Sequence, residues 1–255
     1  MQILSLNING LRAFIQNGRV YNIEKYFDTD VICFQETKSF PVNVSELCGE
    51  VFPHKTFSNS SKFKAGYAGV TTLVAPELLG RVISVDTPEI MSDYGSGRIV
   101  VVNFDSFTLV NVYTLNSGNK ESYRREWDKC FREFINSLPR PLVIVGDLNV
   151  VGSNLDHWSY ERAFNTMPGL YEFELEGFNK LKEEQKLVDA FRLRNPETRA
   201  YSWFSYSGNS RYQNKGWRID YTLVSKDCVD KIKSVKVLSK INASDHCPVM
   251  IDINM

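Results

Sequence analysis

Short runs of apolar, mostly β-branched residues recur along the chain, and several of them end in polar side chains. In the clearest case, residues 142–145 are all apolar and lie between a proline and Gly146, which predicts a short buried strand. Asp147 and Asn149 follow. Because a strand alternates its faces, side chains two residues apart point the same way. Taken alone, this ending equally fits a turn, where Gly, Asp and Asn are favoured.

The same pattern of apolar and polar residues predicts strands in both halves of the chain. These strands cover residues 2–8, 31–34, 69–75, 98–104, 107–113, 201–206, 218–224 and 247–253. The short polar connection between Phe104 and Phe107 predicts a hairpin between two of them. Residues 40–68 are mostly polar, and we expect them to form a loop.

Helical spacing appears in three places. Val20, Ile23 and Phe27 form one apolar face, residues 121–138 form a second, and residues 170–186 form a third. Trp127 lies on the apolar face of the second helix, so it is predicted to be a core residue. Many short strands and a few longer helices predict an α/β fold in which packed sheets have helices outside them.

The composition sets limits on the class of protein. A chain of 255 residues is long enough for one large domain, which we expect to span residues 1–255. Lys and Arg total 30, as do Asp and Glu, so the net charge gives no sign of a polyanionic partner. The sequence begins without the pattern of a signal peptide, and no apolar run has the length of a membrane span. We therefore expect an intracellular protein with no membrane partner.

Cysteine and histidine are too few and too scattered to suggest a zinc framework. The five cysteines include no Cys-x-x-Cys pair, and there are three histidines. An odd number of cysteines without pairing motifs favours reduced thiols. The cysteines are Cys33, Cys48, Cys130, Cys228 and Cys247.

Polar residues at or just beyond the ends of the predicted strands form the candidate site. They are Asn7, Glu36, Tyr113, Asp147, Asn149, Asp220, Asp245 and His246. Each alone has an ordinary structural explanation; Asp220, for example, could pair with Arg218. Burying so many acids together is costly unless they share a cation or hydrogen bonds. Oxygen ligands with one histidine suit Mg²⁺ or Mn²⁺, and the set as a whole suits metal-assisted hydrolysis of a phosphoester.

Six motifs, taken in order, resemble those of one family. They are Asn7-Ile8-Asn9-Gly10-Leu11-Arg12-Ala13, Gln35-Glu36-Thr37-Lys38, Gly66-Tyr67, Gly146-Asp147-Leu148-Asn149-Val150, Gly216-Trp217-Arg218-Ile219-Asp220-Tyr221 and Ser244-Asp245-His246-Cys247-Pro248. The chain thus resembles the exonuclease III-like apurinic/apyrimidinic (AP) endonucleases, within the endonuclease/exonuclease/phosphatase superfamily. The resemblance covers nearly the whole chain.

The resemblance implies a DNase I-like fold, a four-layer α/β sandwich of two mostly antiparallel sheets flanked by helices. It also implies Mg²⁺-dependent cleavage of the DNA phosphodiester 5′ to an abasic site in base excision repair. Activities as a 3′→5′ exonuclease and 3′-phosphatase would accompany that cleavage. The expected partner is double-stranded DNA with abasic sites or 3′-blocked ends. The expected protein is a monomer, cytoplasmic and nucleoid-associated, or nuclear if the source is eukaryotic.

Site roles follow from the resemblance position by position. Glu36 would be the chief metal ligand, with Asn7 and Asp245 beside it. Asp147 would activate the water. The other catalytic residues would be Asn149, Tyr113 and His246, with Asp220 orienting His246. A second metal site at Asp147, Asn149 and His246 stays open, because two-metal clamps are common in this chemistry.

DNA contacts are carried over in the same way. Trp203, Trp217 and Ile219 would wall a pocket for an extruded, base-less sugar, although core packing is the ordinary role of such residues. The remaining predicted contacts are Arg12, Lys38, Lys64, Tyr67, Asn116 and Arg211. Because the net charge is balanced, we expect Lys and Arg to gather on one face, with Glu-rich helices opposite.

Some positions depart from the family pattern. Asn9 stands where relatives have Asp or Asn, and Asn119 stands where some carry a basic residue. Residues 152–176 match worst. Two alternatives therefore stay open: another phosphoesterase of the superfamily, such as a non-specific DNase or a phosphoinositide or sphingomyelin hydrolase, and a catalytically inactive DNA-binding relative. Retention of Glu36, Asp147 and His246 argues against the inactive relative.

Overall fold

The computed structural model describes residues 1–118 and 120–255, so Asn119 lies outside the described residues. Two six-stranded sheets pack face to face. The first has the order β11-β12-β1-β2-β4-β3 and the second the order β5-β6-β7-β8-β10-β9. Strand pairing is antiparallel except between β1 and β2 and between β7 and β8. The predicted pair of mostly antiparallel sheets is therefore confirmed.

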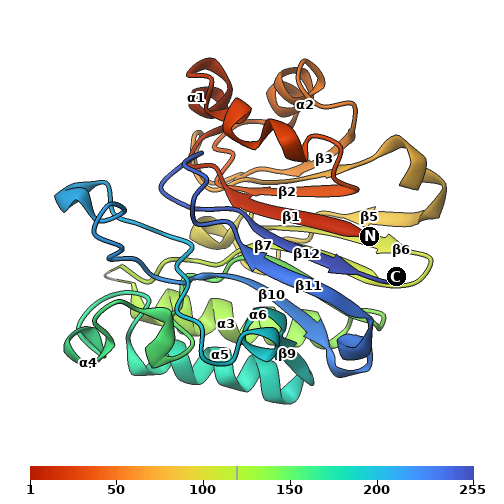
Figure 1. The fold of residues 1–255 in the computed structure, drawn as a ribbon. Helices are drawn as coiled ribbons and strands as arrows, with labels where there is room; N and C mark the ends of the chain where they lie inside the picture. Colours follow the sequence, from red (N-terminus) through yellow and green to blue (C-terminus); the bar gives the residue numbers. More distant parts are fainter. Residues whose placement is uncertain (119) are drawn as a thin grey trace.

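Helices cover the outer face of each sheet, which gives four layers (Figure 1). Valines and isoleucines such as Val31 and Val143 fill the space between the sheets. Leu11 and Phe14, from the first covering helix, pack against residues of the first sheet, and Trp127 lies fully buried against the second sheet, as predicted. Burial of these apolar faces is the main term that stabilises the fold.

The strands have the following bounds. They are β1 (Gln2–Asn7), β2 (Val31–Gln35), β3 (Lys55–Asn59), β4 (Val70–Val74), β5 (Val82–Asp86), β6 (Ile99–Phe104), β7 (Thr108–Tyr113), β8 (Leu142–Asp147), β9 (Leu187–Asp189), β10 (Asp220–Ser225), β11 (Ile232–Val237) and β12 (Val249–Ile253).

Helices lie between many, but not all, of these strands along the chain. The α-helices are α1 (Leu11–Gln16), α2 (Pro41–Gly49), α3 (Glu121–Asn136), α4 (Tyr160–Ala163), α5 (Glu172–Glu184) and α6 (Ala190–Arg194). Short 3₁₀ helices are η1 (Arg19–Tyr26), η2 (Pro76–Arg81), η3 (Asp93–Gly95), η4 (Asn154–Asp156), η5 (Ser207–Asn209) and η6 (Lys226–Lys231). Within the described chain, no helix combines the length and apolarity that a membrane crossing requires.

The two parallel pairs bring the ends of four strands to one edge of the molecule. Asn7 pairs with Gln35 where β1 and β2 end, and Tyr113 pairs with Asp147 where β7 and β8 end. Asp220, at the start of the antiparallel β10, also pairs with Asp147. Because parallel strands finish on the same side, polar residues that are distant in the sequence meet there.

Three predictions about the elements were wrong. Residues 201–206 form isolated bridges from Trp203 to Trp217 and to His246 rather than a strand, because their backbone groups bond to loops. Residues 40–68 contain α2 and β3 as well as loop. The helix expected around Val20 is the 3₁₀ helix η1. The edge strand β5 was not predicted, although Val82, Ile83 and Val85 are β-branched and apolar; most of its residues are exposed.

Candidate active site at the shared edge of the two sheets

A cavity of about 400 Å³ opens where the strand ends meet. It is lined by both sheets and by the loops that follow them. The lining residues are Glu36, Tyr113, Asn116, Asp147, Asn149, Met167, Pro168, Gly169, Trp203, Trp217, Ile219, Asp245 and His246. Most residues of the predicted site are therefore gathered in one cavity, although they come from opposite halves of the chain.

Glu36, Asp147 and His246 form the centre of this cavity. One potential ligand atom from each lies within 4.8 Å of the others, close enough to hold one metal ion. Asn7 joins the two sheets here, since its Nδ2 donates to Glu36 Oε1 at 3.0 Å and to Asp147 Oδ2 at 2.9 Å. The left-handed backbone of Glu36 (φ 52°) turns the chain directly after β2.

His246 is held between two carboxylates. Its Nδ1 lies 2.8 Å from Asp220 Oδ2, and its Nε2 lies 3.9 Å from Asp147 Oδ2. Burial opposes the charged imidazolium, but the carboxylates around it, Asp220 first and then Asp147 and Asp245, together raise the pKa of His246 to about 10. The alternative pairing of Asp220 with Arg218 is wrong; the structure gives Asp220 to the imidazole.

The carboxylates of Glu36, Asp147 and Asp220 lie close together, and their negative charges repel one another. Burial, followed by the charge of Asp220, raises the pKa of Asp147 to about 7. The pKa of Glu36 is instead lowered, despite its burial, chiefly by the Lys38 ammonium 2.9 Å away. The Glu36 and Asp147 carboxylates fit a divalent cation, whose charge would relieve this repulsion, and His246 could join them as a ligand only in its neutral form.

The cluster combines the two metal sites that the sequence predicted. Glu36 comes from the first predicted set, and Asp147 and His246 come from the second. Asp245 lines the same cavity, but its carboxylate accepts hydrogen bonds from Asn9 Nδ2 and from Trp203 Nε1, each at 3.1 Å.

Tyr113 and Asn149 bring hydrogen-bonding groups to the cavity. Burial, followed by the charge of Glu36, raises the pKa of the Tyr113 phenol well above its usual value, so the phenol stays protonated and able to donate. The Arg98 guanidinium donates to the backbone carbonyl of Tyr113 at 3.0 Å, which helps to fix the position of this residue. The Asn149 amide donates to the Thr114 carbonyl at 2.9 Å and accepts from Asn116 Nδ2 at 3.0 Å.

Aromatic and aliphatic side chains form the other wall. The rings of Trp203 and Trp217 meet edge to face with centroids 5.1 Å apart, and Ile219 is buried beside them. Met167 and Pro168 complete the wall. Sequence reasoning missed these last two because they belong to residues 152–176, the stretch that least resembles the family.

A buried ion-pair network behind the aromatic wall was also missed. Arg218 donates to Asp156 Oδ1 at 2.7 Å and Oδ2 at 2.8 Å, and to Asp189 Oδ2 at 2.7 Å. Arg218 and Asp156 are each about 1% exposed. Because Arg218 lies between Trp217 and Ile219, the network holds both wall residues in place. No local sequence pattern indicates that Arg218 pairs with Asp156, which lies 62 residues earlier in the chain.

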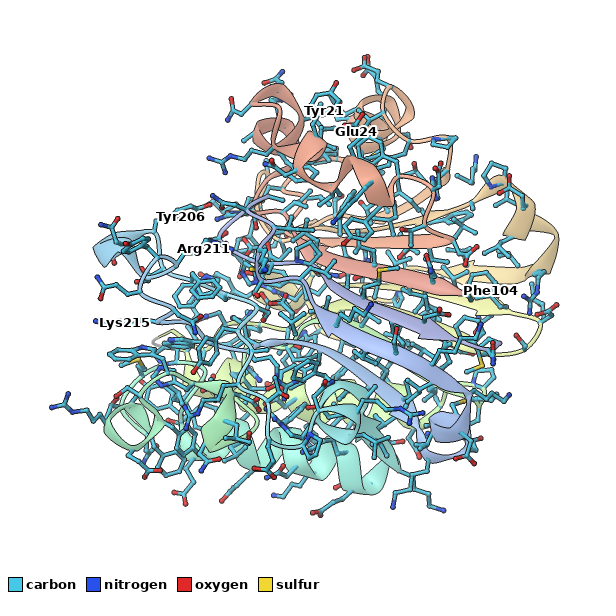
Figure 2. The ribbon with its side chains drawn as sticks, in the orientation of Figure 1. Tyr21, Glu24, Phe104, Tyr206, Arg211 and Lys215 are labelled. Atoms are coloured by element: carbon cyan, nitrogen blue, oxygen red, sulfur yellow. The ribbon has the colours of Figure 1, made fainter. Side chains whose placement is uncertain are left out.

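Other predicted DNA contacts have partners within the protein. Lys38 pairs with Glu36, and the Tyr67 hydroxyl accepts from Arg98 at 2.7 Å. Arg211 donates to backbone carbonyls of residues 241–245. Arg12 and Lys64 have exposed side chains. Figure 2 shows Tyr206, Arg211 and Lys215 together on the loop at the site end of the sheets, with Phe104 at the opposite end.

Two packed mixed sheets with a carboxylate–imidazole cluster at one edge are typical of enzymes that hydrolyse phosphoesters with a divalent metal. The profile of the Endonuclease/Exonuclease/phosphatase family matches residues 4–246, and the chain belongs to this family.

Individual relatives cover the whole chain. An exodeoxyribonuclease of Bacillus subtilis is 31% identical, and the match covers 100% of both chains. The DNA repair nuclease APEX1 of Danio rerio is 32% identical over 98% of this chain and 81% of its own length. Among solved structures, the AP endonuclease LMAP of Leishmania major has a TM-score of 0.88 at 23% identity, covering 100% of this chain and 87% of that one.

Proposed function

We propose that this chain is a Mg²⁺-dependent AP endonuclease that hydrolyses the DNA phosphodiester 5′ to an abasic site. The observation that carries the proposal is the cavity that joins the Glu36–Asp147–His246 cluster to the apolar wall of Trp203, Trp217 and Ile219. Relatives named as a DNA repair nuclease and an exodeoxyribonuclease support it.

The apolar wall suits the substrate. A deoxyribose without its base is small and exposes apolar ring edges, which Trp203 and Trp217 can cover. Extruding such a nucleotide costs less than extruding one with a base, because no base has to be unstacked and unpaired. A cavity of about 400 Å³ holds a sugar and its phosphate, so the wall selects for the abasic nucleotide.

The acid cluster would bind the cation and direct the water. Glu36, with Asn7 and Asp245 near it, would hold Mg²⁺ or Mn²⁺, which when bound neutralises charge on the phosphate. Asp147 accepts the proton of the attacking water. The His246 imidazolium, held by Asp220, donates to a phosphate oxygen, and the Tyr113 phenol and Asn149 amide face the same cavity.

DNA on either side of the cavity would contact the exposed basic residues of the surrounding loops. Arg12 and Lys64 are available for phosphates without breaking an internal ion pair. A 3′-blocked end presents a phosphoester to the same cluster, so 3′→5′ exonuclease and 3′-phosphatase activities are expected from the same residues. We propose that the protein acts as a monomer.

The test compares three duplexes of identical sequence that contain an abasic analogue, an intact nucleotide or a 3′-phosphate. We expect fast, Mg²⁺-dependent nicking 5′ to the abasic analogue and slow digestion of the intact duplex. Equal cleavage of the abasic and intact duplexes would favour a non-specific nuclease instead. A protein that leaves all three uncut in Mg²⁺ and in Mn²⁺ would overturn the proposal.

A further inference from the structure

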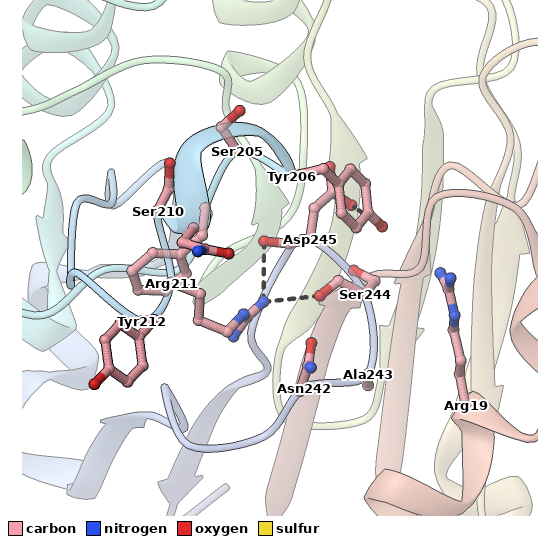
Figure 3. Close-up of a pocket in the computed structure, with 12 residues that line it drawn as sticks. Arg19, Ser205, Tyr206, Ser210, Arg211, Tyr212, Asn242, Ala243, Ser244 and Asp245 are labelled. Atoms are coloured by element: carbon pink, nitrogen blue, oxygen red, sulfur yellow. Dashed lines mark hydrogen bonds between the residues drawn. The ribbon is translucent and has the colours of Figure 1, made fainter.

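Arg211 belongs to the exposed loop of residues 204–215, but its guanidinium points back into the protein. Its Nη2 donates to the carbonyls of Ser244 at 2.8 Å and Asp245 at 3.3 Å (Figure 3). Its Nη1 contacts Cys247 Sγ at 2.9 Å. One side chain therefore bonds to three of the four residues 244–247, the turn that contains His246.

This turn carries two residues of the candidate site. Asp245 and His246 lie between Ser244 and Cys247, and both line the active-site cavity. The turn has other bonds as well: the Ser244 hydroxyl donates to the Asn7 carbonyl and the Cys247 amide donates to the Ser202 carbonyl, each at 2.6 Å. The amide of Phe204 donates to the Asp245 carbonyl at 2.9 Å, so that carbonyl accepts from both Phe204 and Arg211.

The geometry does not favour a direct DNA contact for Arg211. The bonds to the turn engage both of its terminal nitrogens, and its guanidinium lies over the Phe204 ring at 4.8 Å. Presenting the guanidinium to a phosphate would break these bonds and leave the Ser244 carbonyl without its side-chain donor, while the Asp245 carbonyl would keep only the Phe204 amide. Arg211 also lines a second cavity, of about 540 Å³, beside the active-site cavity. Arg19 lines this second cavity too and has an exposed side chain, so it offers a matched surface cation (Figure 3).

We propose that Arg211 is a positioning residue, which fixes the turn of residues 244–247 so that Asp245 and His246 keep their hydrolytic geometry. The proposal rests on the proposed function. A planar guanidinium can bond to two carbonyls and the Cys247 sulfur at once, whereas a lysine ammonium offers a single nitrogen. Without this clamp, His246 can drift relative to Asp147, and small displacements of catalytic groups are costly.

The test uses Arg211→Ala, Arg211→Lys and the control Arg19→Ala on a duplex with one abasic analogue. Single-turnover cleavage is measured with saturating enzyme and Mg²⁺, and DNA affinity is measured in EDTA over a range of NaCl concentrations. We expect Arg211→Ala to cleave about 10–100-fold more slowly, with an unchanged Kd and salt dependence. Arg211→Lys should not restore the rate, and Arg19→Ala should cleave at the wild-type rate.

A direct DNA contact predicts the opposite pattern. Arg211→Ala would then bind more weakly and cleave normally once bound, its salt slope would fall by about 0.9, and lysine would largely restore binding. That pattern would overturn the proposal, as would a rate loss that merely follows the unfolded fraction seen by circular dichroism. Failure of the wild type and of Arg19→Ala to cut abasic DNA would instead contradict the proposed function.

Discussion

The indole Nε1 of Trp203 donates a hydrogen bond to Asp245 Oδ2 at 3.1 Å. A residue of the apolar wall is therefore hydrogen-bonded directly to an acid that lies near the candidate metal site. Trp203 also lies edge to face with Trp217, the second ring of that wall. Selection of the sugar and placement of the acid are therefore not independent. A substrate that displaces the Trp203 ring also displaces a hydrogen-bond donor to Asp245.

Replacing Trp203 by Phe should separate these two roles. Phenylalanine keeps an aromatic wall but removes the N–H, and a hydrogen bond to a charged group is worth about 1.5–3 kcal/mol. We expect kcat on an abasic duplex to fall about tenfold while the preference over intact DNA is kept. Trp158→Phe, at an exposed tryptophan outside the cavity lining, is the control. A Trp203→Phe enzyme with wild-type kcat would show that the bond has no catalytic role.

Divalent cations should stabilise the folded protein itself. The cluster of Glu36, Asp147 and His246 concentrates buried negative charge, and a ligand that binds only the folded state adds about 2.7 kcal/mol at 100 times its Kd. We expect Mg²⁺ or Mn²⁺ to raise the thermal midpoint measured by calorimetry. The shift should be much smaller in Glu36→Gln, and equal shifts in both proteins would place the cation elsewhere.

The Asp156–Arg218 pair should make stability fall at low pH. Burial opposes the charged carboxylate, but the Arg218 guanidinium, with smaller contributions from Ser153 and Arg192, holds the pKa of Asp156 below its usual value. A group with a lowered folded-state pKa stabilises the protein above its unfolded pKa of about 3.9, and this contribution is lost as the pH falls through the folded-state pKa.

Asp156→Asn tests this pair. Removing one partner of a buried ion pair costs about 3–5 kcal/mol, so urea unfolding at neutral pH should show a large loss of stability. The acid-side decline in stability should also become shallower, because the group that titrates has gone. Asp105→Asn is the matched control, since Asp105 pairs with Arg81 on the surface. An Asp156→Asn protein with the wild-type pH profile would rule out this carboxylate as the source of the acid sensitivity.

The sequence predicted the parts of the fold whose signal is local. The buried strands β2 and β8 contain runs of four apolar residues, and β1 is mostly apolar. The polar residues after β2 and β8, such as Glu36 and Asn149, were visible as strand endings. The meeting of these endings follows from the parallel pairing of β1 with β2 and of β7 with β8. The family resemblance predicted two mostly antiparallel sheets, and neither it nor the residue pattern predicted these two parallel pairings.

The parts that could not be predicted depend on contacts between distant residues. The ion pair between Asp156 and Arg218 produces no periodic pattern in the sequence. The position of Met167 in the cavity wall produces none either. Residues 201–206 look like a strand by composition, yet their backbone donors and acceptors bond to residues 217 and 245. The guanidinium of Arg211 likewise points inward because it bonds to carbonyls of residues 241–245. A basic residue in a predicted loop gives no sign of such bonds.

The most direct test of the central claim is the nicking of a duplex with one abasic analogue by wild type and by Asp147→Asn, each in Mg²⁺ and in EDTA. The wild type should nick 5′ to the analogue only when Mg²⁺ is present. Asp147→Asn should bind the duplex normally but lose about 10²–10⁴-fold in rate, because the group that accepts the water's proton is gone. Equal rates for the two proteins, or wild-type nicking that persists in EDTA, would contradict the account.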